Sequence, residues 1–346
     1  MKALLLSSYK NLEFTELPVP VPGPDEVLIR VAACGICGSD VHGYDGGSGR
    51  RIPPIVMGHE AAGIVESAGA SVKNFAPGER VTFDSTVYCG ACPNCLRGDI
   101  NLCDNRQVLG VSCGDYRRAG AFAEFVAVPA RILHRLPENF AFAEAAMLEA
   151  VAVAIHGVNL AQLQADDTAL VIGAGTIGML TLQALRAAGC KKVFVTDVDT
   201  ERLKLAKLLG ATQILLSDEN LQSQILQLTG NQGVGVALEC VGRSETIAAA
   251  IDATRKGGRI VLVGNITPNV NLPLQKVVSR QLRLQGSCAS SGEYPRAIEL
   301  MASGAIKVKP LISAIAPLAD GASWFARLYN REPNLLKVVL TPGNIS

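Results

Sequence analysis

The sequence lacks an excess of charge of either sign. It has 32 Lys and Arg residues against 31 Asp and Glu residues, a net charge of +1 over 346 residues. A protein that binds nucleic acid or an anionic membrane usually presents a basic field to the phosphates. We therefore expect no nucleic-acid partner and no membrane-surface partner. No internal repeat, low-complexity tract or long charged run is seen either.

Cysteine is scarce, and long apolar runs are few. Ten cysteines make up about 3% of the chain, below the roughly 8–10% that marks a disulfide scaffold. Only four apolar residues precede Ser7, too few for the apolar core of a secretion signal, so we expect a cytoplasmic protein.

The stretch Thr168–Leu185 has 18 residues without a charge, which is the lower limit of membrane-spanning length. Because it contains three glycines, we expect a buried strand, a turn and a helix instead.

The length is sufficient for about two domains of roughly 150 residues each. Glycine is abundant, with 34 residues or about 10% against an average of roughly 7%, which predicts many tight turns. The first 145 residues form short β segments separated by Gly and Pro, typical of a β-barrel or sandwich with long loops. The expected strands are Lys2–Ser7, Glu26–Ala33, Ala61–Ser67, Arg80–Phe83 and Ala123–Val128.

From about Ala150 the pattern changes to short apolar runs that alternate with helical stretches. This alternation predicts a parallel sheet, and six strands match a doubly wound nucleotide-binding domain. The expected strands are Ala169–Ile172, Val193–Thr196, Gln213–Leu216, Gly235–Glu239, Arg259–Val263 and Leu282–Gln285. The tail predicts a helix over Tyr294–Ser303 and strands over Pro310–Ile315 and Leu335–Leu340, which either close the second domain or return to the first.

A glycine-rich turn lies between the first of these strands and the next helix. The string Gly173-Ala174-Gly175-Thr176-Ile177-Gly178 fits G-x-G-x-x-G, a weak match alone but a stronger one between a strand and a helix. A pyrophosphate would lie on the helix N-terminus, where free N–H groups favour negative charge. Asp197 ends the next strand 19 residues after Gly178, as expected for a carboxylate that binds an adenosine ribose. Since a carboxylate repels a 2′-phosphate, NAD is favoured over NADP, and Arg202 is a further candidate for cofactor binding.

Four cysteines lie within fifteen residues. Cys89, Cys92, Cys95 and Cys103 have the spacing C-x₂-C-x₂-C-x₇-C, which matches a closed tetrahedral zinc site that contributes to folding. A disulfide pair is disfavoured without a secretion signal. An iron–sulfur cluster is not excluded by spacing, so structural zinc is the favoured assignment and iron stays open.

A second set of metal-binding residue types is more dispersed. Cys37, His59 and Glu60 offer a thiolate, an imidazole and a carboxylate, a plausible three-ligand set for catalytic zinc with a free fourth position. Cys34, Cys113, Cys190, Cys240 and Cys288 show no metal spacing and are expected to be packed thiols.

These motifs resemble a known family in their order along nearly the whole chain. The strings Cys-Gly-Ser-Asp-Val-His and Gly-His-Glu-Ala-Ala-Gly, the four-cysteine lobe, Gly120-Ala121-Phe122-Ala123-Glu124 and the glycine turn resemble the zinc-containing medium-chain alcohol dehydrogenases, and most of all their sorbitol and polyol dehydrogenase branch. The resemblance implies an α/β chain with a GroES-like β-barrel catalytic domain, residues 1–149 and 288–346, interrupted by a Rossmann NAD-binding domain, residues 150–287.

The resemblance also implies residue roles. Cys37, His59 and Glu60 would bind catalytic zinc, and Glu149 would bind it directly or hold its water, although Ala150 replaces the proline usual after that glutamate. Ser39 would take the hydroxyl proton of the substrate and His42 would help to pass it out. The protein would thus use NAD and two Zn²⁺ per chain and assemble as a homodimer or homotetramer. His134 and His156 are expected to be structural.

The substrate is the least determined feature. A small polar alcohol needs a polar pocket, because each hydroxyl left unpaired costs about 1–3 kcal/mol. Candidate lining residues are Tyr44, Arg50, Arg51 and Tyr294, with Asp45, Tyr116, Arg117 and Glu293 also considered. The arginine pair permits a phosphorylated polyol, because guanidinium forks match phosphate oxygens.

The sequence therefore leaves several functions open. The favoured one is NAD-dependent oxidation of a secondary alcohol of a polyol or sugar derivative to a ketone. The competitors are a polyol-phosphate dehydrogenase such as one for galactitol phosphate, an L-threonine 3-dehydrogenase, and a non-catalytic NAD(H)-binding sensor or structural protein. A zinc-free quinone reductase is disfavoured, because it would not require either set of metal ligands.

Overall fold

The computed structural model describes residues 1–113 and 116–343, with side chains at Cys113 and Tyr116 left out of the description. The chain divides into two compact units. Unit 1 contains residues 1–149, 294–298 and 308–346, and unit 2 contains residues 150–293 and 299–307. The predicted break at 287/288 compares with one at 293/294 in the structure, and the tail returns to the first unit.

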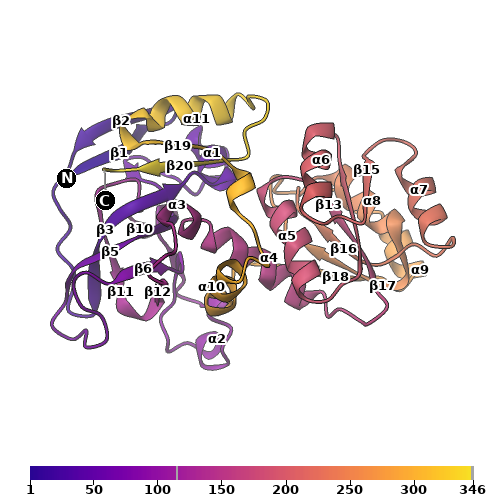
Figure 1. Cartoon of the computed structure of the whole chain (residues 1–346), viewed down its shortest axis with the longest axis horizontal. Helices are drawn as coiled ribbons and strands as arrows, with labels where there is room; N and C mark the ends of the chain where they lie inside the picture. The colour runs from indigo at the N-terminus through magenta and orange to yellow at the C-terminus, as the bar shows by residue number, and fades with distance from the viewer. Residues whose placement is uncertain (114–115, 344–346) are drawn as a thin grey trace. The chain divides into compact units, whose positions relative to one another are not determined.

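The principal sheet of unit 1 joins the two ends of the chain. Its strand order is β12-β6-β5-β3-β20-β19, with β11 also paired to β3. Both termini and the terminal strands lie in this unit (Figure 1). The bounds of these strands are β3 Glu26–Gly35, β5 Glu60–Ala68, β6 Arg80–Phe83, β11 Phe125–Pro129, β12 Leu133–Arg135, β19 Ile312–Pro317 and β20 Lys337–Thr341.

Three smaller sheets complete the strands described in unit 1. They are β2-β1-β4, β10-β9 and β7-β8, with bounds β1 Lys2–Ser8, β2 Asn11–Glu16, β4 Ile55–Val56, β7 Thr86–Val87, β8 Gln107–Val108, β9 Val111–Cys113 and β10 Tyr116–Arg118. The helices of this unit are α1 Gly38–Tyr44, α2 Pro93–Leu96, α3 Phe142–Ala145 and α11 Gly321–Tyr329, with 3₁₀ turns at Ile100–Leu102, Ala130–Ile132, Lys309–Leu311 and Leu318–Asp320. One apolar core, which includes Leu4, Ile29, Phe122 and Phe325, holds the sheets and α11 together.

Unit 2 confirms the predicted doubly wound sheet. Six parallel strands run in the order β15-β14-β13-β16-β17-β18, so the first strand in sequence, β13, lies at the centre where the order reverses. The strands are β13 Thr168–Ile172, β14 Lys192–Asp197, β15 Gln213–Leu216, β16 Val234–Glu239, β17 Thr254–Leu262 and β18 Arg283–Gly286. The helices are α5 Thr176–Ala187, α6 Thr200–Leu208, α7 Leu221–Leu228, α8 Ser244–Ala253 and α9 Leu274–Ser279. Two more, α4 Leu148–Leu160 and α10 Tyr294–Ala302, each contribute residues to both units.

The uncharged stretch Thr168–Leu185 is a strand, a turn and a helix, as predicted. A different stretch, Phe142–Leu160, meets the length and composition of a membrane span. Since 61% of that window is buried inside the protein, as in an ordinary core helix, it is weak support for a span.

One strand prediction in the tail was wrong at its start. Pro310, expected to lie in a strand, belongs to a 3₁₀ turn, and β19 begins only at Ile312. Proline has no N–H to give to a sheet and its φ angle is fixed, so a turn suits it better than a paired strand position.

Candidate metal centre and coenzyme turn

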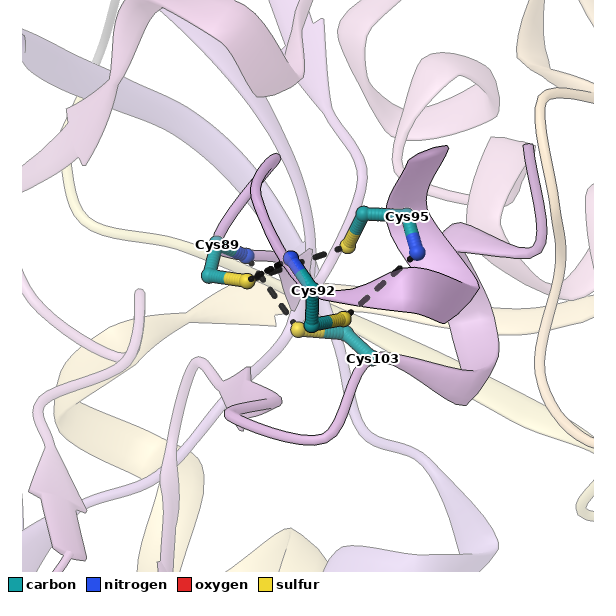
Figure 2. A group of neighbouring side chains, drawn as sticks. All are labelled: Cys89, Cys92, Cys95 and Cys103. Carbon is teal, nitrogen blue, oxygen red and sulfur yellow. Dashed lines mark hydrogen bonds between the residues drawn. The ribbon is translucent and has the colours of Figure 1, made fainter. Parts of the chain in front are cut away.

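Four cysteine side chains converge in a lobe of unit 1. Figure 2 shows Cys89, Cys92, Cys95 and Cys103 with their sulfur atoms turned toward one another. All four sulfur atoms lie within 4.8 Å of one another, and Sγ of Cys89 is 4.0 Å from Sγ of Cys95. A tetrahedral Zn–S distance of about 2.3 Å would place the sulfur atoms about 3.8 Å apart, close to this arrangement.

The local backbone stabilises thiolates in this lobe. The N–H groups of Ala91 and Cys92 donate to Sγ of Cys89 at 3.4 and 3.3 Å, and these bonds lower the pKa of Cys89 to about 6. Burial and neighbouring thiols raise the pKa of Cys95 to about 12, as expected where several thiols crowd together without a cation. The four thiols are unpaired rather than joined as disulfides. The lobe therefore fits one metal ion in tetrahedral coordination by four thiolates, which is the coordination that structural zinc prefers.

A second group of ligand atoms lies in the principal sheet, where β3 ends and β5 begins. The ligand atoms of Cys37, His59 and Glu60 lie within 4.8 Å of one another. Cys37 caps the N-terminus of α1 directly after β3, and Glu60 begins β5 opposite Gly35. The sheet thus brings together residues from two separate sequence segments. A thiolate, an imidazole and a carboxylate suit zinc with one open position.

His59 is oriented by a buried carboxylate. Nδ1 of His59 lies 3.3 Å from Oδ1 of Asp40, which leaves Nε2 for a metal. Burial favours the neutral form of Asp40, but His59 and Arg51 outweigh it and hold the pKa of Asp40 well below its ordinary value. For His59, burial lowers the pKa, but Asp40 and Cys37 raise it by a larger amount. The pKa of His59 is therefore well above its ordinary value. The Asp40 carboxylate thus stabilises positive charge on the His59 ring or on a metal bound to it.

Glu60 has a cationic partner from the far end of the sequence. Nζ of Lys337, at the start of β20, lies 2.5 Å from Oε2 of Glu60 and donates to the carbonyl of Ile36 at 3.1 Å. Both side chains are almost completely buried. Burial acts to lower the pKa of Lys337, but Glu60 and Cys37 raise it overall, so the lysine stays charged. Lys337 thereby offsets one of the negative charges gathered at the centre.

Glu149 lies outside the group of three close ligand atoms. Ser85 Oγ donates to its Oε1 at 3.4 Å. Burial, together with the carboxylates of Glu60 and Asp84, raises the pKa of Glu149 to about 7 even though His59 opposes this shift. Such a carboxyl can take up or release a proton near neutral pH.

Ser39 lies at the rim of this centre. Its Oγ is 3.3 Å from Sγ of Cys37 and 3.4 Å from Nε2 of His59, and the residue is exposed. His42 follows on the same short helix, with its side chain half-buried. A hydroxyl within reach of two metal-ligand atoms is well placed to contact an oxygen bound beside them.

The glycine turn of unit 2 has the expected place and shape. Gly173 follows β13 with a φ of +94°, and Gly175 caps the N-terminus of α5, which begins at Thr176 and includes Ile177 and Gly178. A Cβ at Gly178 would lie 1.7 Å from the carbonyl oxygen of Gly173, so only glycine permits this close turn. No atom lies within 4 Å of a Cβ placed at Gly175, which leaves room beside the helix N-terminus for a pyrophosphate.

Asp197 lies at the end of β14, next to that turn. Its Oδ2 accepts from the N–H of Ala174 at 2.5 Å, and its Oδ1 accepts from the N–H of Asp199 at 2.9 Å. The carboxylate is therefore fixed beside the loop. Arg202 is 3.5 Å from Asp199 on α6 and is half-buried.

The candidate substrate residues lie in different surroundings. Tyr44 is half-buried, packs on Phe325 and Tyr329 against the core of unit 1, and donates to the carbonyl of Lys10. Tyr294 is buried and stacks on His134 with ring centroids 4.8 Å apart. Arg50 is exposed. Arg51 alone among these four donates to site residues, namely Ser39 and Asp40.

Three side chains that surround the centre had no predicted role. Asp40, Lys337 and Ser85 contact His59, Glu60 and Glu149 respectively. Asp40 lies inside the string that carries the family resemblance, so its position was a usable signal. Lys337 is 277 residues from its partner, and only the pairing of β20 with β3 brings it there.

His134, His156 and three of the remaining cysteines are held in packed surroundings, and Cys288 is half-buried. Burial lowers the pKa of His134 to about 4, and Nδ1 of His156 lies 2.8 Å from Oε1 of Glu293. Cys34 and Cys190 are buried, and burial raises the pKa of Cys240 to about 12. The side chain of Cys113 lies outside the described part of the chain.

Comparisons with known proteins agree with both units. Residues 23–138 match the family described as alcohol dehydrogenase GroES-like domain, and residues 176–303 match zinc-binding dehydrogenase. The chain is 32% identical to a sorbitol dehydrogenase of Bacillus subtilis over 99% of this chain and 98% of that one. It is 35% identical to an L-idonate 5-dehydrogenase of Vitis vinifera over 90% of this chain and 86% of that protein.

Solved structures agree over the full length. An Escherichia coli oxidoreductase/dehydrogenase of unknown specificity superposes with a TM-score of 0.93 at 31% identity, covering 99% of both chains. Galactitol-1-phosphate dehydrogenase of Escherichia coli superposes with a TM-score of 0.90 at 28% identity, covering 99% of this chain and 100% of that one.

Proposed function

We propose an activity from one premise, which is that this chain belongs to the zinc-type medium-chain alcohol dehydrogenases, in their sorbitol dehydrogenase-like branch. The protein is an oxidoreductase that acts on a small alcohol. Its specific reaction is oxidation of a secondary alcohol of a polyol or sugar derivative to a ketone, with NAD⁺ as the hydride acceptor. The observation that carries this proposal is the Cys37, His59 and Glu60 donor set with the Ser39 hydroxyl at its rim.

The chain's residues have separable tasks in this reaction. Cys37, His59 and Glu60 would hold zinc, which supplies the Lewis acidity that makes an alcohol hydroxyl easier to deprotonate. Ser39 Oγ receives or passes on the hydroxyl proton, and Asp40 keeps the His59 ring in one orientation. Glu149 Oε1, with a pKa of about 7, can hold a proton or a water beside the centre. His42 would pass the proton out.

Unit 2 supplies the coenzyme site of the proposal. Gly173, Gly175 and Gly178 form the turn for the pyrophosphate, and the Asp197 carboxylate favours the free ribose hydroxyls of NAD over the phosphate of NADP. β18 lies at an edge of the sheet, and an edge strand is a template for pairing with another chain. A homodimer or homotetramer in the cytoplasm completes the proposal.

A substrate panel tests the reaction. Purified zinc-loaded protein is mixed with NAD⁺ and with D-sorbitol, L-idonate, galactitol 1-phosphate or L-threonine, and NADH formation is followed by absorbance. We expect turnover with at least one polyol or sugar derivative and loss of at least about 100-fold in kcat for Cys37→Ser. Cys190→Ser is the matched control, because Cys190 donates to backbone carbonyls in unit 2 and serine retains a donor.

The panel distinguishes the alternatives. Turnover of L-threonine alone would replace the polyol assignment, and turnover of the phosphorylated substrate alone would favour the polyol-phosphate function. No turnover with any substrate, together with a single zinc per chain, would favour a non-catalytic NAD(H)-binding protein.

The coenzyme preference has its own test. Asp197→Ala removes the carboxylate that repels a 2′-phosphate, so the ratio of kcat/KM with NAD⁺ to that with NADP⁺ should fall at least about tenfold. Asp252→Ala is the control, because Asp252 is a carboxylate of unit 2 that pairs with Lys276 on α9 instead of bonding the glycine turn. That variant should keep the coenzyme ratio. An unchanged ratio in Asp197→Ala would contradict the assignment.

A further inference from the structure

A buried arginine next to the metal centre has no task in the reaction derived above. Arg51 lies between α1 and β4 and is only 4% exposed. A guanidinium is rarely buried to this degree unless it is paired. Its Nε is buried without a hydrogen-bond partner among the described residues, which costs about 1–3 kcal/mol. The arginine is therefore held in place by its other contacts.

Those contacts reach both sides of the metal centre. Nη2 donates to Oγ of Ser39 at 3.1 Å and to Oδ1 of Asp40 at 3.0 Å. The same Asp40 accepts from the N–H of Cys37 through Oδ2 at 3.3 Å and faces Nδ1 of His59 through Oδ1 at 3.3 Å. One guanidinium nitrogen thus links the reactive hydroxyl to the carboxylate that orients the imidazole ligand.

Gly43 gives the arginine its path to the site. A Cβ at position 43 would lie 2.5 Å from Cγ of Arg51 and 3.0 Å from its Cβ. The φ angle of Gly43 is not in the left-handed region, so glycine serves here to leave space rather than to permit a turn. α1 and the Arg51 side chain therefore fit together as one unit.

The contact with Ser39 constrains where its proton points. A guanidinium only donates hydrogen bonds, so at this contact the Ser39 oxygen accepts. The Ser39 O–H can then donate to another acceptor, and Sγ of Cys37 lies 3.3 Å from its Oγ. Nε2 of His59 lies 3.4 Å from the same oxygen. An alcohol oxygen bound beside these two ligand atoms would be a further partner for the Ser39 hydroxyl.

We propose that Arg51 is a positioning residue of the active centre, which orients the Ser39 hydroxyl toward the substrate oxygen while it anchors Asp40 behind His59. The inference rests on the proposed dehydrogenase function. It assigns to Arg51 a task different from lining a phosphate pocket, because its Nη2 donates to both Ser39 and Asp40.

A double-mutant cycle tests the proposal on the zinc-loaded holoenzyme with the substrate that the panel identifies. Arg51→Met removes the donor and keeps most of the side-chain volume. We expect kcat to fall about 10- to 100-fold, with KM for NAD⁺ unchanged and two zinc ions retained. In a Ser39→Ala background the same change should cost less than about threefold, because the hydroxyl that Arg51 orients is gone. Arg51→Lys should recover part of kcat, since it keeps a charged donor.

Two further variants separate position from chemistry. Gly43→Ala leaves the guanidinium intact but displaces its stem, and it should lower kcat as Arg51→Met does. Arg118→Met is the matched control, because Arg118 also has a buried Nε without a partner and pairs with a carboxylate, Glu26, but contacts no site residue. Its kcat should be unchanged.

The contrary outcomes are distinct. Equal costs of Arg51→Met with and without the Ser39 hydroxyl, a kcat within twofold of wild type, or a defect explained by zinc loss alone would each overturn the role of Arg51. Wild-type protein without turnover on any substrate would instead refute the proposed function itself.

Discussion

At the scale of single residues, the centre gathers more carboxylates than cations. Glu60, Asp84, Asp40 and Glu149 lie around one thiol and one imidazole, and the full charge of Lys337 and Arg51 offsets only part of this. Burial, together with the carboxylates of Glu60 and Asp84, makes Glu149 hold its proton more tightly and raises its pKa to about 7. A divalent cation at the centre would lower the pKa of Glu149, because a nearby positive charge favours the ionised carboxylate.

This balance predicts a pH-dependent stability for protein stripped of its catalytic metal. The folded pKa of Glu149 is about 7, above the ordinary 4.5, so the folded state holds a proton that the unfolded state has released. Stability from this group is present at low pH and is lost as pH rises through this window, by about 1–3 kcal/mol. Glu149→Gln cannot ionise, so its urea-unfolding free energy relative to wild type should increase between about pH 5 and about pH 8.

Zinc provides the control for that measurement. When the metal is restored, the wild-type carboxylate gains a cationic partner, and the advantage of Glu149→Gln at high pH should disappear or reverse. A difference between the two proteins that does not change with pH would contradict a raised pKa of Glu149 in the folded protein.

What the sequence could predict at this scale depended on local spacing. Cys89, Cys92 and Cys95 are separated by two residues each, so a short loop brings them together whatever the rest of the fold does. Lys337 reaches Glu60 only because β20 pairs with β3, and no local pattern encodes that contact. Arg51 was expected near the substrate, but its contact with Ser39 depends on the space left by Gly43.

At the scale of elements, the strand–turn–helix of β13 and α5 uses its glycines for different purposes. A Cβ at Gly178 would collide with the carbonyl of Gly173, whereas a Cβ at Gly175 would meet no atom within 4 Å. Gly178 is required by the packing of the turn, whereas Gly175 leaves room for a ligand. The motif alone does not distinguish these roles.

Two substitutions should therefore have opposite signatures. Gly178→Ala should destabilise unit 2 by about 1–3 kcal/mol and lower the melting temperature, because the turn must open to admit the methyl group. Gly175→Ala should leave the melting temperature within about 1–2 °C of wild type but weaken NAD⁺ binding at least about tenfold, measured by fluorescence titration. Normal NAD⁺ affinity in Gly175→Ala would contradict the assignment of this turn as the pyrophosphate site.

Three strand boundaries were predicted to within one residue. Arg80–Phe83 and Gln213–Leu216 have the predicted bounds, and the central strand β13 differs by a single residue. The helix after the glycine turn begins at Thr176, inside the G-x-G-x-x-G string, because Gly175 itself caps it. Capping depends on backbone angles, which a periodicity of apolar residues does not report.

At the scale of the whole molecule, the two chain ends build one unit. β20 pairs with β3 in antiparallel orientation. This pairing brings Lys337, at the start of β20, to Glu60 of the ligand group. Sequence patterns predicted a parallel sheet in the middle of the chain from alternation, but they left open where the tail goes. Strand pairing between residues about 300 positions apart is a tertiary choice, which a local pattern does not determine.

The two metal groups should be independent in stability, and this gives a whole-molecule prediction. The cysteine lobe takes all four ligands from residues 89–103, and none of these cysteines belongs to the apolar core of unit 1. Cys95→Ser should therefore lower the metal content from two zinc ions to one per chain and expose residues 89–106 to protease, while the sheet of unit 1 stays folded.

The catalytic group should show the reverse behaviour. His59→Ala should also leave one zinc per chain, but it should abolish turnover without new cleavage in the lobe, because the four thiolates of that lobe do not depend on His59. Metal content by elemental analysis, limited proteolysis with mass spectrometry, and circular dichroism together check both variants. Loss of both metals on either single substitution, or global unfolding of Cys95→Ser, would show that the lobe and the catalytic centre form one cooperative unit instead of two.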